Sequence, residues 1–273
     1  MSDPTFIAHR GFAGAAPENT VAAFEAAADH GADMVELDVM PCADGEVVVF
    51  HDDRLEGEGR PLTDAEGVVW ETPCEAVLAA EVLDSGHAVP RLADVFDALP
   101  ADVGVNVELK NPGSNSVRRG ESLPGEDRVP ARRRWQGFVD DVFDIVDEYD
   151  HDVLFSSFCE GALAAVRHRS EEYPIGVLVG SALHDGLAVA RRYDAEAVHP
   201  PRNAVSGTPF HGDPYLGTTP DDPDLDVVAE AHDDGRDVTV WTVDTWYQAA
   251  QLREAGVDGI VADYPGLLVG GRP

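Results

Sequence analysis

Short apolar runs alternate with polar and alanine-rich stretches along most of the chain. The apolar run at residues 5–8 predicts a strand. The alanine-rich segment behind Asn19 and Thr20 predicts a helix that continues to about His30, with either residue as its N-cap. The chain is therefore expected to open with a strand followed by a helix.

Apolar and acidic residues then alternate in the stretch 34–39. A period of two is typical of a β-strand, because successive side chains of a strand point to opposite faces. Glu36 and Asp38 therefore point the same way, with valine and leucine on the other face. Alone, such a pair in an acidic protein is usually a solvated strand face, so its meaning depends on what the rest of the chain brings near it.

A second apolar run, 47–50, follows too closely for a helical crossover. The segment between the two runs contains Asp44 and Gly45, a pair typical of a hairpin turn. If these two residues form the turn, Asp38 pairs with His51. The pattern therefore predicts a β-hairpin arm that places a histidine opposite the acidic pair.

The remainder of the chain repeats strand and helix. With the hairpin arm set aside, the strands that we expect to be parallel are 5–8, 34–39, 104–110, 153–157, 175–179, 195–199, 237–243 and 258–262. Later helices are expected at about 91–99, 136–149, 160–170, 182–192, 223–234 and 244–255, with a short one in the tail. Eight strands that alternate with helices predict an α/β fold, a distorted (β/α)8 TIM barrel.

Two tracts interrupt this rhythm, and we interpret both as inserted loops on the active-site face. Residues 52–90 are rich in Gly, Pro and acids, with one expected helix at about 73–83. Residues 111–135 contain Arg118, Arg119, Arg128, Arg132, Arg133 and Arg134. This arginine tract either folds over an anionic head group or pairs with the acidic surface. No linker divides the chain, so a single domain is expected over residues 1–273.

The chain is strongly acidic. Its 273 residues include 52 acidic and 19 basic ones, which gives a formal charge of −33. This charge repels nucleic acid and anionic membranes, so neither is expected as a partner. Acid excess with 18 arginines and one lysine is typical of a halophilic protein, because ~1 M salt screens surface charges over roughly 3 Å. The single lysine, Lys110, therefore stands out as a residue with a task.

The cysteines and the apolar segments favour a cytoplasmic location. Cys42, Cys74 and Cys159 are odd in number, scattered and without metal-ligand spacing, which suits a reducing interior. The strand at 5–8 leaves no room for a signal peptide, and no apolar run has the length of a membrane span. We expect no stable membrane association, and the sequence leaves the oligomeric state open.

Active sites of such barrels lie at the carboxyl ends of the strands. The polar residues expected there are His9, Arg10, Glu36, Asp38, His51, Glu108 and Lys110, and less pointedly Ser156, Ser157, His199 and Trp241. Three carboxylates from two strands predict an oxygen-only site for Mg2+ or Ca2+. Two histidines can divide the acid and base roles, and the arginine and lysine can stabilise negative charge, so the set predicts a site for a phosphate ester.

The same residues form motifs in a known order. They are His9-Arg10-Gly11, Pro17-Glu18-Asn19-Thr20, Glu36-Leu37-Asp38-Val39, His51-Asp52, Glu108-Leu109-Lys110, Ser156-Ser157-Phe158, Trp241-Thr242-Val243 and Asp263-Tyr264-Pro265. From residue 7 to about 265 the chain resembles the glycerophosphodiester phosphodiesterase family. Two features depart from the family pattern, because Cys159 stands where an acid or amide is common and the tract 111–135 is longer than usual.

The resemblance implies metal-dependent hydrolysis of a small-molecule glycerophosphodiester to glycerol 3-phosphate and an alcohol. By position it assigns the metal to Glu36, Asp38 and Glu108, acid and base catalysis to His9 and His51, and phosphate contacts to Arg10 and Lys110. In the family pattern His9 is nearer the attack side and His51 protonates the leaving oxygen, although the sequence alone does not fix which is the base. Trp241 is expected to pack in the barrel or to lie on the glycerol face of the substrate.

Two alternatives remain open at this point. A related barrel phosphodiesterase of the lysophospholipase D type would act on lipid head groups, and a non-catalytic barrel would only bind phosphorylated polyols. The presence of both His9 and His51 favours an enzyme over the second alternative. The remaining polar candidates are interpreted as cap or loop residues (Glu18, Asn19), unreactive hydrogen-bonding residues (Ser156, Ser157) and surface or loop histidines (His184, His199, His211, His232).

Overall fold

The computed structural model describes residues 3–268 of the chain. Its parallel strands follow one another in the order β1-β9-β8-β7-β6-β5-β4-β2, and the pairing of β1 with β2 closes the barrel. They are β1 (Thr5–His9), β2 (Met34–Pro41), β4 (Gly104–Leu109), β5 (Val153–Ser157), β6 (Ile175–Leu178), β7 (Ala197–His199), β8 (Asp237–Val243) and β9 (Gly259–Ala262). The (β/α)8 barrel expected from the sequence is confirmed.

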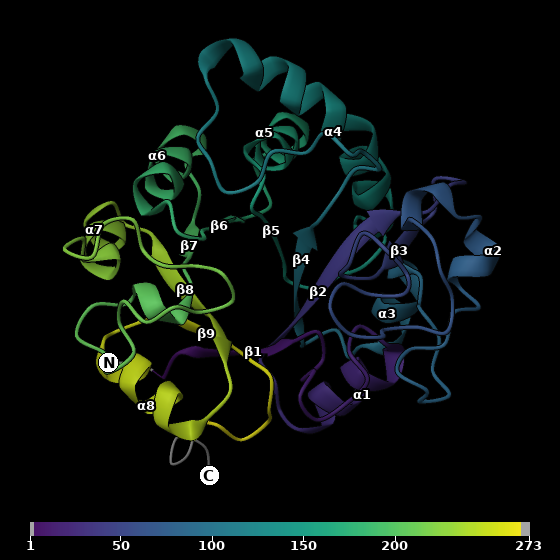
Figure 1. The fold of residues 1–273 in the computed structure, drawn as a ribbon, viewed down its shortest axis with the longest axis horizontal. Coiled ribbons are helices and arrows are strands. Elements are labelled where there is room, and N and C mark those ends of the chain that lie inside the picture. Colours follow the sequence, from purple (N-terminus) through teal and green to yellow (C-terminus); the bar gives the residue numbers. More distant parts are fainter. Residues whose placement is uncertain (1–2, 269–273) are drawn as a thin grey trace.

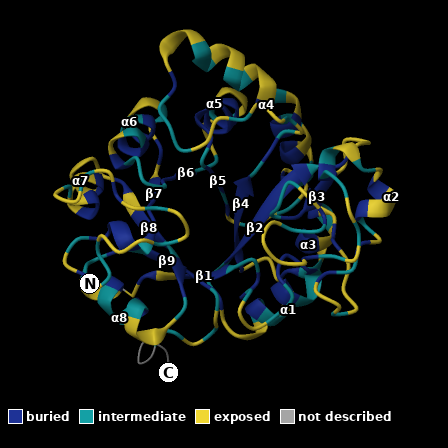
Figure 2. Cartoon of the chain, in the orientation of Figure 1, coloured by how far each residue is buried: buried dark blue, intermediate teal, exposed yellow. Residues whose placement is uncertain are grey.

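Helices form a ring around the strands (Figure 1). They are α1 (Val21–Asp29), α3 (Leu92–Ala98), α4 (Gly125–Val146), α5 (Glu160–Arg169), α6 (Leu183–Tyr193), α7 (Val227–Asp233) and α8 (Trp246–Glu254). Figure 2 shows the strands and the inner faces of the helices buried and the outer faces exposed. Among the described residues, no helix combines the length and the apolar character that crossing a membrane requires. Residues 263–268 contain no helix, and the rest of the expected tail helix lies outside the described residues.

The register of the strands brings the expected site residues to neighbouring positions. His9 on β1 pairs with Glu36 on β2, and Asp38 on β2 pairs with Glu108 on β4. Glu108 in turn pairs with Ser156 on β5. Because adjacent parallel strands lie about 4.8 Å apart, these side chains gather at one end of the barrel.

The hairpin arm is confirmed, but its register differs from the expected one by a single residue. β3 (Val47–Val49) pairs antiparallel with β2, and the amide of Phe50 donates to the Asp38 carbonyl at 2.9 Å. Asp38 therefore lies opposite Phe50, and the expected pairing with His51 is wrong. The turn holds three residues instead of two, with Gly45 at a φ of +87° that suits glycine.

The insertion at 52–90 has a small hydrophobic core of its own. Leu55, Leu62, Val69 and Val82 pack against Met40, Val48 and Phe50 of the hairpin arm. The regular structure here is limited to the 3-10 turn η1 (Val69–Glu71) and to α2 (Cys74–Val77), which is shorter than the expected helix at 73–83. Both ends of the insertion return to β3, because the amide of Val49 donates to the Pro90 carbonyl at 2.9 Å and Val48 bridges Arg91.

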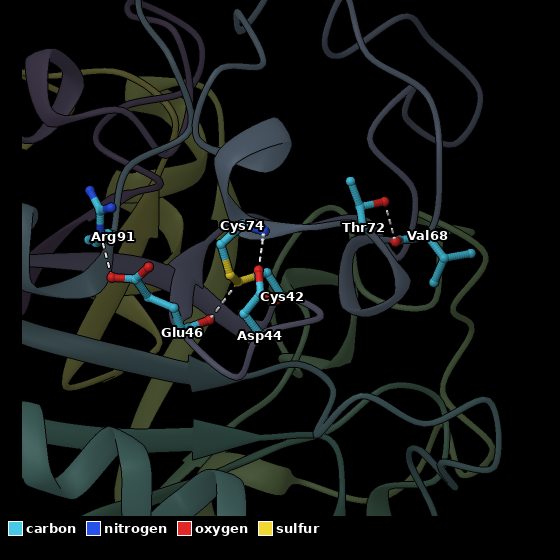
Figure 3. Close-up of a disulfide and its surroundings, with 7 residues drawn as sticks. All are labelled: Cys42, Asp44, Glu46, Val68, Thr72, Cys74 and Arg91. Carbon is cyan, nitrogen blue, oxygen red and sulfur yellow. Dashed lines mark hydrogen bonds and ion pairs between the residues drawn. A yellow bond between two sulfur atoms is a disulfide. The ribbon is translucent and has the colours of Figure 1, made fainter.

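A disulfide ties this insertion to the hairpin arm (Figure 3). Cys42 and Cys74 have their Cα atoms 5.4 Å apart, within the ordinary range for such a bond, while Cys159 is free and buried. Asp44 supports the junction by accepting a hydrogen bond from the Cys74 amide at 2.9 Å. The spacing of the cysteines therefore gave no sign of this bond, since pairing depends on distance in the fold and not on spacing in the sequence. The cytoplasmic location stays a prediction, without support from the cysteines.

The arginine tract is more regular than expected. Helix α4 begins at Gly125, so the second half of the supposed loop 111–135 is helical, with Pro130 near the helix start. The inner face of this early part buries Trp135, and α4 packs against α5. Burial of the tryptophan outweighs the poor helix propensity of the glycine and proline.

Candidate active site

Three carboxylates form the centre of the site. Glu36 and Asp38 on β2 and Glu108 on β4 are all buried, and one oxygen of each lies within 4.8 Å of the others. The alternation of the two strands turns these side chains into the barrel, while the intervening Leu37 and Val107 face the helices and the hydrophobic core. The acidic pair read from the sequence thus lies in the interior with a third acid.

Two cations lie against these carboxylates. The Nε of Arg10 is 3.3 Å from Asp38, and the backbone amide of Arg10 donates to Glu36 at 3.1 Å. The Nζ of Lys110 is 2.8 Å from Glu108 and 3.5 Å from Asp38. Arg10 reaches this place because its backbone adopts a left-handed conformation, with φ at 49°, directly after β1.

Burial and neighbouring charges together shift the pKa values of the three acids in different directions. Burial raises the pKa of Glu36 well above its usual value, and the charges of Asp38 and Glu108 add to the shift. Burial also raises the pKa of Glu108, against the opposing effect of Lys110. For Asp38, burial acts in the same direction, but the surrounding charges, Lys110 foremost, outweigh it and hold the pKa below its usual range. The three buried carboxylates thus outnumber the two cations that lie against them.

His9 stands at the edge of the cluster with a carboxylate behind it. Its Nδ1 is hydrogen bonded to Asp263 at 2.6 Å, and its Nε2 lies 4.0 Å from Glu36. Burial acts to raise the pKa of Asp263, but the hydrogen bond with His9 and the positive charges nearby hold it below the usual value. An ionised Asp263 fixes the proton of His9 on Nδ1 and leaves Nε2 free toward the cavity.

His51, directly after the hairpin arm, also has a carboxylate behind it. Its Nδ1 is hydrogen bonded to Asp52 at 2.5 Å, so its Nε2 is also left free. Burial lowers the pKa of His51 to about 4, and the charges of Lys110 and Arg10 add to the effect. The free protein therefore holds His51 neutral at pH 7. Although its pairing in the hairpin was mispredicted, His51 lies at the site.

One cavity of about 480 Å3 is lined by Glu36, Glu108, both cations and both histidines, and its wall also includes Phe158 and Trp241. The two rings meet edge to face with their centres 5.7 Å apart. An adjoining cavity of about 460 Å3 shares His51, Lys110 and Phe158 with the first and extends to Arg119. The site thus has an inner lobe, lined by Glu36 and Glu108, and an outer lobe beyond His51.

Sequence reasoning missed a second layer of polar residues. Asn19 donates to Asp38 at 2.9 Å, and Glu18 accepts a hydrogen bond from Arg10 at 2.8 Å and another from Arg60. The N-cap of α1 is Thr20, whose hydroxyl accepts from the Ala23 amide at 3.2 Å. The Pro-Glu-Asn-Thr motif was thus the available signal, and its middle residues support the site as well as the loop.

His199 was also misread. It was interpreted as a surface or loop histidine, but it ends β7, is buried, and lines the inner lobe. The indole nitrogen of Trp241 donates to the His199 carbonyl at 2.8 Å. Its place at the end of a predicted strand was the signal that could have identified it.

The arginines of the tract 111–135 were expected either to meet an anionic head group or to pair with surface acids, and the structure contains examples of both positions. Arg119 reaches the outer lobe, where it lies 3.3 Å from Asp53. Arg118 pairs with Glu121 and Asp127, and Arg128 pairs with Glu160, away from the carboxylate cluster. One arginine of the tract is thus placed to meet a ligand, and these others pair with acids.

The sequence profile of the glycerophosphoryl diester phosphodiesterase family matches residues 9–267. The chain belongs to this family. It is thereby an enzyme of the phosphoric diester hydrolase class. Glycerophosphodiester phosphodiesterases of Caldanaerobacter subterraneus subsp. tengcongensis and Bacillus altitudinis are 29% and 30% identical to it over 272 residues. These alignments cover 96% of this chain in both cases, and 95% and 96% of the relatives.

Solved structures of phosphodiesterases share the fold. A phosphodiesterase of Oleispira antarctica, in complex with the product sn-glycerol-3-phosphate, superimposes with a TM-score of 0.74 at 26% sequence identity. The aligned region covers 96% of this chain and 94% of that phosphodiesterase. The glycerophosphodiester phosphodiesterase of Thermotoga maritima has a TM-score of 0.70 at 22% identity and covers 100% of both chains, which supports the fold alone. The barrel of this family member is thus matched over nearly its full length.

Proposed function

We propose that the protein hydrolyses glycerophosphodiesters to glycerol 3-phosphate and an alcohol, with a divalent metal ion, Mg2+ or Ca2+, as cofactor. The observation that carries this proposal is the convergence of three carboxylates with two cations and two carboxylate-paired histidines, at a cavity that all of these residues except Asp38 line. The relative from Oleispira antarctica was solved with sn-glycerol-3-phosphate, the product expected here.

Glu36, Asp38 and Glu108 would hold the metal. Carboxylate oxygens are the ligands that Mg2+ and Ca2+ prefer, and Oδ1 of Asp38 accepts no hydrogen bond from the described residues. The raised pKa values of Glu36 and Glu108 reflect buried negative charge that a dication would neutralise. When bound, the metal would polarise the phosphoryl group and offset its charge.

Arg10 and Lys110 supply the positive charge that the chain itself brings. Burial acts to lower both pKa values, but neighbouring carboxylates outweigh it and raise them, so both side chains stay cationic at neutral pH. A phosphodiester carries one negative charge and gains another during attack by water. The two side chains are therefore suited to bind the ester and to stabilise the charge that develops.

The two histidines divide the proton transfers. His9, fixed by Asp263, accepts the proton of the attacking water at Nε2, and His51 delivers a proton to the leaving alcohol from Nε2. A bound phosphodiester places negative charge beside His51 and offsets Lys110 and Arg10, so it raises the pKa of His51 toward the range that a general acid needs. The outer lobe beyond His51 then receives the leaving alcohol.

Hydrolysis of glycerophosphocholine tests the proposal, with glycerol 3-phosphate and choline measured in ~1 M KCl. We expect release of both products with Mg2+ or Ca2+, loss of activity in excess EDTA and recovery when the metal is returned. Glu36→Gln, Asp38→Asn and Glu108→Gln should each abolish hydrolysis while circular dichroism shows an intact fold. Undiminished activity in excess EDTA would contradict the role of the metal.

Lysophosphatidylcholine assayed in parallel separates the lysophospholipase D type from the proposed activity. Faster release of choline from the lysolipid than from glycerophosphocholine would favour it. Binding of glycerol 3-phosphate without hydrolysis of any diester would favour a barrel that only binds phosphorylated polyols. We also propose that residues 1–273 form a single domain, because the insertion packs on the hairpin arm of the barrel.

A further inference from the structure

Three buried polar side chains on the wall of the inner lobe find no hydrogen-bond partner among the described residues. The atoms are Oδ1 of Asn106, Oγ of Ser156 and both ring nitrogens of His199. The three residues are 2%, 0% and 1% exposed, respectively. Buried polar groups are almost always hydrogen bonded, so three of them on one cavity wall indicate a place where a ligand supplies the partners.

The backbone brings His199 and Ser156 together. Ser156 pairs in register with Gly176 on β6, and a Cβ atom at Gly176 would overlap the His199 ring. The imidazole therefore lies over the glycine, beside Ser156 on the next strand, yet the two side chains make no hydrogen bond with each other. Because Gly176 has no side chain, the space inside the barrel at this strand position is free for the imidazole of His199.

Asn106 extends this group toward the carboxylates. It precedes Glu108 by two residues on β4, so both side chains point into the barrel, and it pairs in register with Glu36. The interior of such barrels is ordinarily filled by branched apolar residues, which makes a serine, an asparagine and a histidine at these positions unusual. The group therefore connects directly to the site where the phosphoryl group is proposed to bind.

The wall formed by these residues is uncharged. Burial lowers the pKa of His199 to about 4, so the ring is neutral at pH 7 and offers one donor and one acceptor. Serine and asparagine likewise offer neutral hydrogen-bonding groups. Such a set is matched to alcohol hydroxyls and not to a phosphate or an ammonium group, which the charged side chains across the cavity would bind.

We propose that Asn106, Ser156 and His199 bind the hydroxyl groups of the glycerol that remains esterified to phosphate, and that they select substrates with this polyol. This inference rests on the proposed function, because it assumes that the phosphoryl group lies at the carboxylate cluster. The leaving alcohol then points past His51 into the outer lobe. Selectivity for the retained polyol therefore lies in the inner lobe.

The test compares two diesters with the same leaving group. Glycerophosphocholine has the two hydroxyls, and propyl phosphocholine lacks them. A site built to hydrogen bond a hydroxyl rejects the analogue without it strongly, so we expect the full-length, metal-loaded protein to prefer glycerophosphocholine by at least about 10²-fold in kcat/KM.

Ser156→Ala and His199→Phe remove the hydrogen-bonding groups while keeping most of the volume. Each should lower kcat/KM on glycerophosphocholine by about 10- to 100-fold and leave propyl phosphocholine within about 3-fold of the wild type. His184→Phe, at an exposed histidine paired with Asp222, is the matched control and should change neither substrate. Equal losses on both diesters, or no loss on either, would overturn the proposed selectivity.

Calorimetry separates failure of this inference from failure of the proposed function. If the wild type hydrolyses neither diester, the proposed function is overturned. Binding of sn-glycerol 3-phosphate and of propyl phosphate, measured by calorimetry, then still tests the subsite. The two variants should weaken binding of sn-glycerol 3-phosphate by about 10-fold or more and leave that of propyl phosphate unchanged. Unchanged binding of both ligands would overturn the inference.

Discussion

His9 and Asp263 are joined by a 2.6 Å hydrogen bond although 254 positions separate them in the sequence. His9 ends the first strand of the barrel and Asp263 follows the last, and the pairing of β1 with β9 makes these strands neighbours. Closure of the barrel thus assembles the carboxylate and the imidazole. Their pairing is the part of the proposed mechanism that depends most directly on the closed fold.

Asp263→Asn should lower kcat by about 10- to 100-fold, because an amide does not hold the proton of His9 on Nδ1 as a carboxylate does. The pair of His232 and Asp258, 2.8 Å apart and partly exposed, gives a matched control. Asp258→Asn should leave kcat near that of the wild type. Equal kcat values for the two variants would remove Asp263 from the mechanism.

Lys110→Met should lower kcat/KM by a factor on the order of 10² or more, because the side chain contacts the proposed phosphate site. A loss of stability is also expected, because Nζ lies 2.8 Å from the buried Glu108. Removing the cation leaves buried carboxylates uncompensated, so the metal-free variant should lose about 3 kcal/mol of unfolding free energy.

Denaturant titration of the Lys110→Met variant with and without Mg2+ or Ca2+ checks this point. A dication would neutralise the same carboxylates, so most of the lost stability should return when the metal is added. Unchanged stability of the metal-free variant would show that the lysine is not needed to balance the cluster.

His199 should make the stability of the protein depend on pH. Burial lowers its pKa from the usual value of 6.5 to about 4, so between these values the unfolded chain binds a proton that the folded protein does not. Stability is then fully present above about pH 6.5 and is lost as the pH falls through 4, by about 3 kcal/mol in total. Urea titrations at several pH values should show that the unfolding free energy of His199→Phe depends less on pH than that of the wild type. An equal pH dependence in the two proteins would contradict the lowered pKa of His199.

The Cys42–Cys74 disulfide closes a loop with a sequence separation of 32. Loop-closure entropy predicts that Cys42→Ser with Cys74→Ser lowers the unfolding free energy by about 3 to 4 kcal/mol. Thermal unfolding with and without dithiothreitol provides the control within one experiment. The wild type should fall to the midpoint of the double variant when reduced, and the double variant should not respond. If the untreated wild type and the double variant unfold at the same midpoint temperature, the disulfide does not stabilise the protein.

The order of the barrel strands and the polar residues at their ends followed from the sequence because alternation and strand ends are local properties. Glu36, Asp38 and Glu108 were found together for this reason, since their side chains share one face of adjacent strands. The register of the hairpin was missed by one residue because the backbone uses a three-residue turn at Gly45 instead of the two-residue turn that Asp44-Gly45 suggests.

Other features depended on contacts that no local pattern contains. The Cys42–Cys74 bond and the start of α4 at Gly125 are set by packing between distant segments. His199 was misjudged because histidine is common on surfaces, and the reason for its burial lies in Gly176 on another strand. A lone polar residue at a strand end is informative only when its neighbours in the barrel are known.

The insertion at 52–90 leaves and rejoins the barrel at β3, through the bond from Val49 to Pro90 and the bridge from Val48 to Arg91. Its own hydrophobic cluster and the disulfide hold it together between these points. It is therefore a module whose replacement would leave the strands that carry the carboxylates unaltered. A replacement that keeps Asp52, the partner of His51, would change the entrance to the cavity while the groups below it stay in place.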